Sequence, residues 1–125
     1  MVTTDVSQLT AECKDWVQIL RNYRDELQTS KKSLQEICRK DLSKQQLLDV
    51  EHFDNQFHIQ LINIHDLKHS IKIHERRIEH ESAFGDVGDD NYTLHEELLS
   101  EFLGLENTLQ ELRNEFKAFI STTSC

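Results

Sequence analysis

The sequence predicts an all-α fold: an up-down-up bundle of three long antiparallel helices with coiled-coil-like packing. The 125 residues include three glycines and no proline, whereas β-sandwiches and barrels need these residues at many turns. Glu, Lys, Gln and Leu are abundant, and all four favour helix. Apolar residues recur at alternating spacings of three and four, as they do along the buried face of a helix. We therefore expect a single helical-bundle domain over residues 1–125.

The first predicted helix spans about residues 5–40. Its apolar positions continue for more than four heptads, which indicates a helix that packs along its whole length. Ser30 is the polar exception in this pattern. The apolar positions are Val6, Leu9, Cys13, Trp16, Leu20, Tyr23, Leu27, Leu34 and Ile37.

The second predicted helix spans about residues 44–84. If the 3-4 spacing of the first helix is continued beyond Ile37, it falls mostly on polar residues. The apolar residues that follow are shifted by about one position, which indicates that the helix stops and restarts. Ser43 and Gln46 have the spacing of a capping box, so we expect a turn near residues 41–43. A continuous helix over 6–84 in a swapped assembly is the alternative. The new stripe is Leu47, Val50, Phe53, Phe57, Leu61, Ile64, Leu67, Ile71 and Ile78.

The third predicted helix spans about residues 93–120. It follows the clearest loop of the chain, residues 84–91, which holds two of the three glycines. Thr93 and Glu96 have the spacing of a capping box and predict the start of this helix. Its apolar stripe is Leu94, Leu98, Phe102, Leu105, Leu109, Leu112, Phe116 and Phe119.

Composition and motifs argue against several classes of function. The formal net charge is −9, which disfavours binding to nucleic acid. No apolar run approaches the ~20 residues of a membrane span, and the first residues lack the features of a signal peptide. We therefore expect a cytoplasmic protein that does not bind membranes. The glycines form no phosphate-binding loop and no nucleophile motif is present, so we expect no enzymatic activity.

The three cysteines, Cys13, Cys38 and Cys125, show no C-x-x-C spacing. Their odd number gives no disulfide framework and no cysteine-rich zinc motif. We therefore interpret them as buried or incidental thiols in a reducing compartment.

A second apolar stripe lies on the opposite face of the middle helix, and a three-helix bundle would leave it in water. We expect such surplus apolar positions to form a self-association surface, most simply a homodimer. The predicted function is thus protein–protein interaction or self-assembly without a cofactor, and a helix of another protein is a further candidate partner. The predicted interface residues are Leu48, Ile59, Ile62, His69, Ile73, Leu99 and Leu103.

Six of the seven histidines lie in the middle segment, which suggests a metal- or small-ligand-binding bundle as the alternative function. His65 and His69 are four residues apart on one helical face and could hold one ion, provided that another helix supplied a ligand such as His95. These histidines could also sense pH. If His69 is buried in the dimer, its protonation would weaken the dimer.

Residues 48–57 and 67–71, LDVEHFDNQF and LKHSI, resemble stretches in small uncharacterised bacterial helical-bundle proteins. This resemblance covers about a quarter of the chain and implies a cytoplasmic helical protein with no activity to carry over. The three-helix arrangement with an early Trp16 also resembles a spectrin-type repeat in length, which implies shared architecture only.

Overall fold

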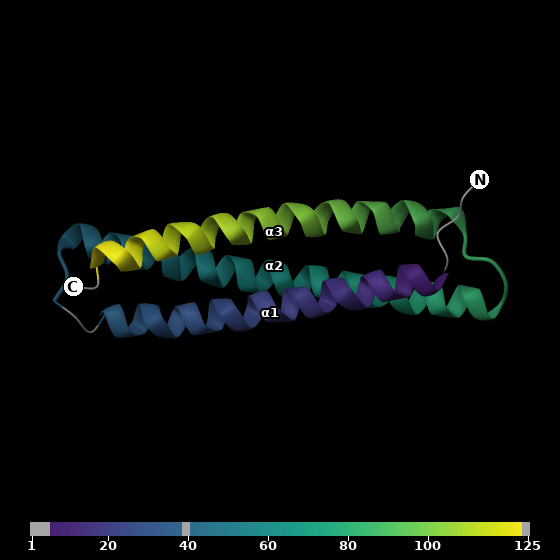
Figure 1. Cartoon of the computed structure of the whole chain (residues 1–125), viewed down its shortest axis with the longest axis horizontal. Helices are drawn as coiled ribbons and strands as arrows, with labels where there is room; N and C mark the ends of the chain where they lie inside the picture. Colours follow the sequence, from purple (N-terminus) through teal and green to yellow (C-terminus); the bar gives the residue numbers. More distant parts are fainter. Residues whose placement is uncertain (1–5, 39–40, 124–125) are drawn as a thin grey trace.

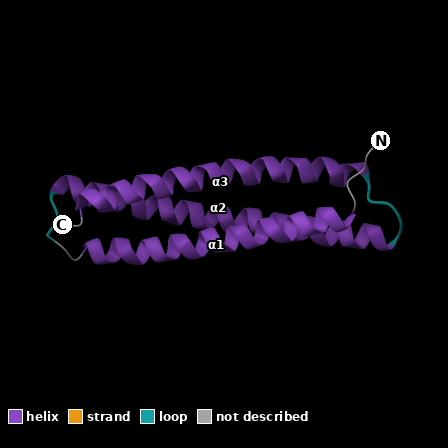
Figure 2. Cartoon of the chain, viewed as in Figure 1, coloured by secondary structure: helices purple, strands orange, loops and turns teal. Residues whose placement is uncertain are grey.

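The computed structural model describes residues 6–38 and 41–123 of the chain. They form three long helices, α1 (Val6–Cys38), α2 (Lys44–Ala83) and α3 (Asp89–Thr123). Figure 1 shows the helices side by side along their length, with α2 antiparallel to α1 and α3. Over the described residues, only the two connections between helices are not helical (Figure 2). The predicted all-α, up-down-up bundle is therefore confirmed.

The predicted turn between the first two helices is confirmed, because residues 41–43 are not helical. Ser43 and Gln46 form the expected capping box at the start of α2. The Ser43 Oγ accepts a hydrogen bond from the backbone N–H of Gln46 at 3.2 Å, and the Gln46 Oε1 accepts one from the backbone N–H of Ser43 at 2.9 Å. A continuous helix over 6–84 is therefore wrong for this chain. The predicted ends of the first helix, at residue 5 and at residues 39–40, lie outside the described residues.

The start of the third helix corrects the sequence prediction, since α3 begins at Asp89 and not near Thr93. The Glu81 carboxylate accepts hydrogen bonds from the backbone N–H of Gly88 at 2.9 Å and from the Asn91 Nδ2 at 2.6 Å. These two hydrogen bonds hold the pKa of Glu81 below its ordinary value. The first turn also contains Asp89 and Asp90, whose charges favour a helix N-terminus. This capping by α2 cannot be recognised from local spacing.

The loop between α2 and α3 depends on one glycine. Gly85 has a φ of 135°, a backbone conformation that residues with a side chain rarely adopt. Val87 folds back from this loop and is buried beside Leu9 and Ile78. The loop therefore covers one end of the core.

The predicted stripes of α1 and α3 form most of the core, from Leu9 to Ile37 and from Leu98 to Phe119. At the end near the first turn, aromatic rings pack closely, with 4.9 Å between the ring centroids of Phe57 and Phe116. The predicted stripe of α2 needs a correction. Leu47 is 52% exposed, while Gln60 and His74 occupy buried positions between apolar residues.

The parallel helices α1 and α3 are joined by a two-bond ion pair at the surface of the bundle. The Arg113 guanidinium donates to both carboxylate oxygens of Glu26 at 2.5 and 2.6 Å. Ser30, the polar exception in the first apolar pattern, lines a cavity of about 200 Å³ between these helices. None of the three helices, as far as they are described, has both the length and the apolar character needed to cross a membrane.

The cap of α2 can be tested by the substitution Ser43→Ala, which removes the acceptor for the Gln46 N–H. We expect the free energy of unfolding to fall by about 1 kcal/mol, measured by urea denaturation. Ser70→Ala, at an exposed position inside α2, serves as the control and should not lower stability. An equal loss in both variants would contradict the role of Ser43 as a cap.

Candidate metal centre

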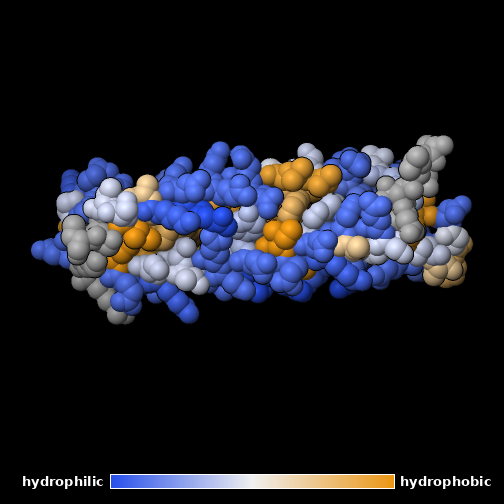
Figure 3. Space-filling model, viewed as in Figure 1, coloured by the Kyte–Doolittle hydropathy of each residue, from blue (hydrophilic) through white to orange (hydrophobic). Residues whose placement is uncertain are grey.

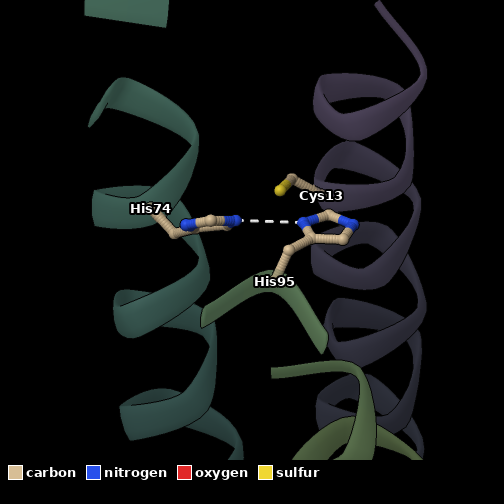
Figure 4. Close-up of side chains that lie close together, drawn as sticks. All are labelled: Cys13, His74 and His95. Atoms are coloured by element: carbon tan, nitrogen blue, oxygen red, sulfur yellow. Dashed lines mark hydrogen bonds between the residues drawn. The ribbon is translucent and has the colours of Figure 1, made fainter. Parts of the chain in front are cut away.

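Polar side chains from all three helices meet inside the bundle near its loop-covered end. Cys13 of α1, His74 of α2 and His95 of α3 are almost completely buried, with exposed fractions of 0, 1 and 4%. Figure 4 shows the imidazole of His74 pointing at that of His95, with the thiol of Cys13 beside them. Because histidine side chains are rarely buried without partners, this cluster is the strongest functional candidate in the chain.

The helical repeat itself places these residues in the core. Cys13 stands one turn from buried Leu9 and Trp16, and His74 stands one turn from buried Ile71 and Ile78. Residues three or four apart lie on the same helical face. The three polar residues therefore occupy positions that leucine or isoleucine would fill in an ordinary bundle.

The three side chains are close enough to share one ligand. The Cys13 Sγ, one nitrogen of His74 and one of His95 lie within 4.8 Å of one another. The His74 Nε2 and the His95 Nδ1 share a hydrogen bond of 2.9 Å. The His95 ring also packs on the indole of Trp16, with 4.7 Å between the centroids. Packing and hydrogen bonding thus hold the orientation of both rings.

Two carboxylates border this cluster. The Glu12 Oε1 lies 3.6 Å from the His95 Nε2, the ring nitrogen that faces away from His74. The side chain of Glu75 is 15% exposed, and its Oε2 lies 3.6 Å from the Nζ of Lys14. A positively charged species placed among the three core side chains would therefore find negative charge close by.

Buried polar atoms without hydrogen-bond partners are concentrated at this place. Within the described residues, four such side-chain atoms occur, and all belong to the cluster or its two carboxylates: Glu12 Oε2, His74 Nδ1, Glu75 Oε2 and His95 Nε2. A buried unpaired polar group costs about 1–3 kcal/mol, and native structures contain few of them. Their accumulation at one point distinguishes this cluster from the rest of the described core.

Burial favours the neutral forms of the Cys13 thiol and the His74 imidazole. Burial, followed by the charges of Glu75 and Glu12, raises the pKa of the Cys13 thiol to about 12. Burial also lowers the pKa of His74 to about 4, with smaller effects from His95 and Arg77. A neutral imidazole offers a lone pair to a metal ion, whereas the thiol must lose its proton to bind one.

A thiolate and two imidazoles are typical ligands of zinc and copper. In a tetrahedral zinc site the ligand atoms are separated by roughly 3.3–3.7 Å, given bond lengths of about 2.3 Å to sulfur and 2.0 Å to nitrogen. The 2.9 Å between the two imidazole nitrogens would have to widen by only a few tenths of an ångström. The sulfur and nitrogen atoms lie within 4.8 Å of one another, so the sulfur has to move closer to the nitrogens by up to about 1 Å to reach the separation of a tetrahedral site.

The metal pair predicted from the sequence does not gain its third ligand. His65 and His69 are both exposed on α2, and the only group of three metal-binding side chains found within residues 6–38 and 41–123 is Cys13, His74 and His95. His95, the expected partner of that pair, instead forms a hydrogen bond with His74. Cys13 is buried, as the interpretation of the cysteines as buried or incidental thiols allows, but that interpretation did not include its position beside two histidines. A histidine or cysteine in place of an apolar residue in the stripe was the available signal.

The predicted interface residues lie at the surface of the single chain or near it. Figure 3 shows that the face formed by α1 and α3 is mostly hydrophilic, with hydrophobic residues gathered in a few patches. Leu99 is half-buried and packs against the core, and His69 is exposed. The remaining five are at least 41% exposed: Leu48, Ile59, Ile62, Ile73 and Leu103.

Comparisons with known proteins do not identify a family for this chain. No family model, curated protein or solved structure matches the chain. The function is therefore argued from the residues and their arrangement.

We expect the metal-free protein to lose stability as the pH falls from about 7 to about 5. The pKa of His74 is about 4 in the folded chain, against an ordinary value of 6.5. Over this range the unfolded chain therefore gains a proton that the folded chain does not take up, and the free energy of unfolding should fall by about 2 kcal/mol. Urea denaturation in the presence of a chelator measures this change.

A double variant, His65→Ala with His69→Ala, is the control for this pH dependence. Both side chains are exposed, so their removal should leave the loss of stability at low pH unchanged. A free energy of unfolding that stays constant from about pH 7 to about pH 5 would contradict the burial of a neutral His74.

Proposed function

We propose that this protein is a metal-binding helical bundle that holds one transition-metal ion at Cys13, His74 and His95. The observation that carries the proposal is the meeting of three buried ligand atoms within 4.8 Å of one another. It is supported by the four unpartnered polar atoms around the same point. Gln60, another buried polar residue, accepts a hydrogen bond from Asn63 and does not belong to this group.

A metal ion at this point would connect all three helices, because each helix supplies one ligand. Binding to the folded chain alone adds stability by mass action, about 2.7 kcal/mol when the free ion is at a hundred times its Kd. The ion would thus fix the loop-covered end of the bundle, where the core contains polar side chains. The opposite end is packed by phenylalanine rings.

Metal content and thermal stability test this proposal. We expect the protein, freed of metal and then mixed with Zn²⁺, to retain about one ion per chain after gel filtration, and its Tm to rise by about 10 °C at saturating metal. Elemental analysis and calorimetry are the measurements. Cys38→Ser and Cys125→Ser should be present throughout, so that Cys13 is the only thiol.

Cys13→Ser is the decisive variant in this background, because the change is nearly isosteric but removes the thiolate. It should abolish the retained zinc and the rise in Tm. The double variant His65→Ala with His69→Ala should retain both. Metal retention that depends on His65 and His69 but not on Cys13 would overturn the proposed site.

A second candidate function is self-association through α2, as the sequence predicts. Leu48, Ile59, Ile62 and Ile73 are between 41 and 52% exposed, and their spacings of 11, 3 and 11 residues align them within one narrow stripe along the helix. The stripe extends over roughly 37 Å of helix. A continuous line of exposed aliphatic side chains favours burial against another chain, and a two-fold homodimer is the simplest arrangement.

Ile62→Glu should weaken this self-association, because it places a charge in the middle of the apolar stripe. We expect the wild-type chain to sediment as a dimer and the variant to sediment as a monomer at the same concentration. Gln28→Glu, which adds the same charge at an exposed position on α1, should remain dimeric. A wild-type chain that sediments as a monomer at high concentration would contradict this second function.

A further inference from the structure

We propose that the Cys13–His74–His95 centre binds Zn²⁺ with Glu75 as its fourth ligand, while Glu12 orients His95 from outside. The inference rests on the proposed metal-binding function and specifies its ion and its complete set of residues. It follows from the positions of the two carboxylates and from the charge of the assembled centre.

The fourth ligand is assigned to Glu75 because of its position beside His74 and its unpartnered buried oxygen. Glu75 follows His74 directly on α2 and reaches across to α1, where its Oε2 lies 3.6 Å from the Nζ of Lys14, the neighbour of Cys13. This oxygen is buried and accepts no hydrogen bond. After burial, the negative charge of Glu75 is the next cause of the raised pKa of the Cys13 thiol. The ligand atoms that lie within 4.8 Å of one another do not include the Glu75 carboxylate, so its side chain has to rotate to reach the ion.

Little holds the Glu75 carboxylate in its present position. Its ion pair with Lys14 is long, and the Lys14 side chain is 68% exposed. The pair is therefore open to solvent at its lysine end, while the Glu75 side chain is only 15% exposed. A rotation of the Glu75 side chain toward Cys13 would exchange this long ion pair for a metal–oxygen bond.

Glu12 has a different place, on the outer side of His95. Its Oε1 lies 3.6 Å from the His95 Nε2, and neither this nitrogen nor the Glu12 Oε2 has a hydrogen-bond partner. A carboxylate in this position favours the tautomer with hydrogen on Nε2, which leaves the Nδ1 lone pair directed at His74 and Cys13. Metal-bound histidines commonly donate their second N–H to a carboxylate in this way. Glu12 is therefore a positioning residue.

The charge of the assembled centre favours a divalent ion. On binding, the Cys13 thiol releases its proton to solvent and a metal–sulfur bond forms, while the hydrogen of His74 moves from Nε2 to Nδ1 through exchange with solvent. A thiolate and the Glu75 carboxylate then neutralise the two positive charges of Zn²⁺. A neutral buried centre avoids the large cost of a net charge in the core. One sulfur, two nitrogens and one oxygen are all ligands that Zn²⁺ accepts in tetrahedral geometry.

Three single substitutions in the Cys38→Ser, Cys125→Ser background test this assignment: Glu75→Gln, Glu12→Gln and Glu79→Gln. Glu79 is exposed, one turn from Glu75, and its charge also acts on Cys13. Glu79→Gln is therefore the matched control for the loss of one nearby negative charge. The affinity for Zn²⁺ is measured by competition with a chromophoric chelator, and Co²⁺ serves as the spectroscopic probe of the ligand set.

We expect Glu75→Gln to weaken zinc binding at least about 100-fold and to change the visible spectrum of the Co²⁺ form, since a ligand is lost. Glu12→Gln should weaken binding about 10- to 100-fold and leave the four-coordinate Co²⁺ spectrum in place. Glu79→Gln should change the affinity less than about threefold. Circular dichroism checks that each variant keeps its helices.

Each part of the proposal can fail separately. If Glu75→Gln matches Glu79→Gln in affinity and spectrum, Glu75 is not a ligand, and if Glu12→Gln does so, Glu12 does not position His95. If the wild-type protein binds Cu²⁺ through Cys13 but not Zn²⁺, the choice of ion is wrong while the proposed metal-binding function stands. If Cys13→Ser changes the binding of neither ion, the proposed function itself is overturned.

Discussion

Three long helices with one apolar stripe each can bury those stripes only against one another, and this constraint governs the whole molecule. Every side chain at a 3-4 position is drawn into the shared core, whatever its chemistry. Cys13, His74 and His95 occupy such positions, so the same packing that buries leucine and phenylalanine also brings a thiol and two imidazoles together. The fold and the candidate site thus have a single physical cause.

The two ends of the bundle differ in the kind of side chain that this packing buries. Near the first turn, the core is filled by aromatic rings in close contact, such as Phe53 and Phe116. Near the loop, the core contains four polar atoms that have no hydrogen-bond partner among the residues that the structure describes. The buried apolar residues form a large cluster along most of the bundle and a smaller one, Leu9, Ile78 and Val87, at the loop-covered end, so apolar packing on both sides offsets the cost of the polar groups. Such an arrangement is typical of proteins that accept a local cost in stability at a functional site.

The sequence pattern predicted the architecture well, because helical periodicity depends only on which residues are apolar. The turn at 41–43 was also predictable, since the shift of the stripe and the Ser43 cap are local signals. The start of α3 was not predictable, because it depends on Glu81, which binds the loop from the preceding helix. The candidate site was predicted only in part. The histidines of the middle segment suggest metal binding as an alternative function, but their spacing favours His65 and His69, which are exposed, and does not distinguish His74, which is buried.

The helical character of the chain, the break between its first two helices and the buried faces of α1 and α3 follow from the spacing of neighbouring residues along one helix. Which polar residues meet depends on how the three helices pack together. Cys13, His74 and His95 are far apart along the chain, and their approach to within 4.8 Å depends on the axial register of three helices. Register is set by interlocking side chains and by the lengths of two loops, so no periodicity within a single helix specifies it.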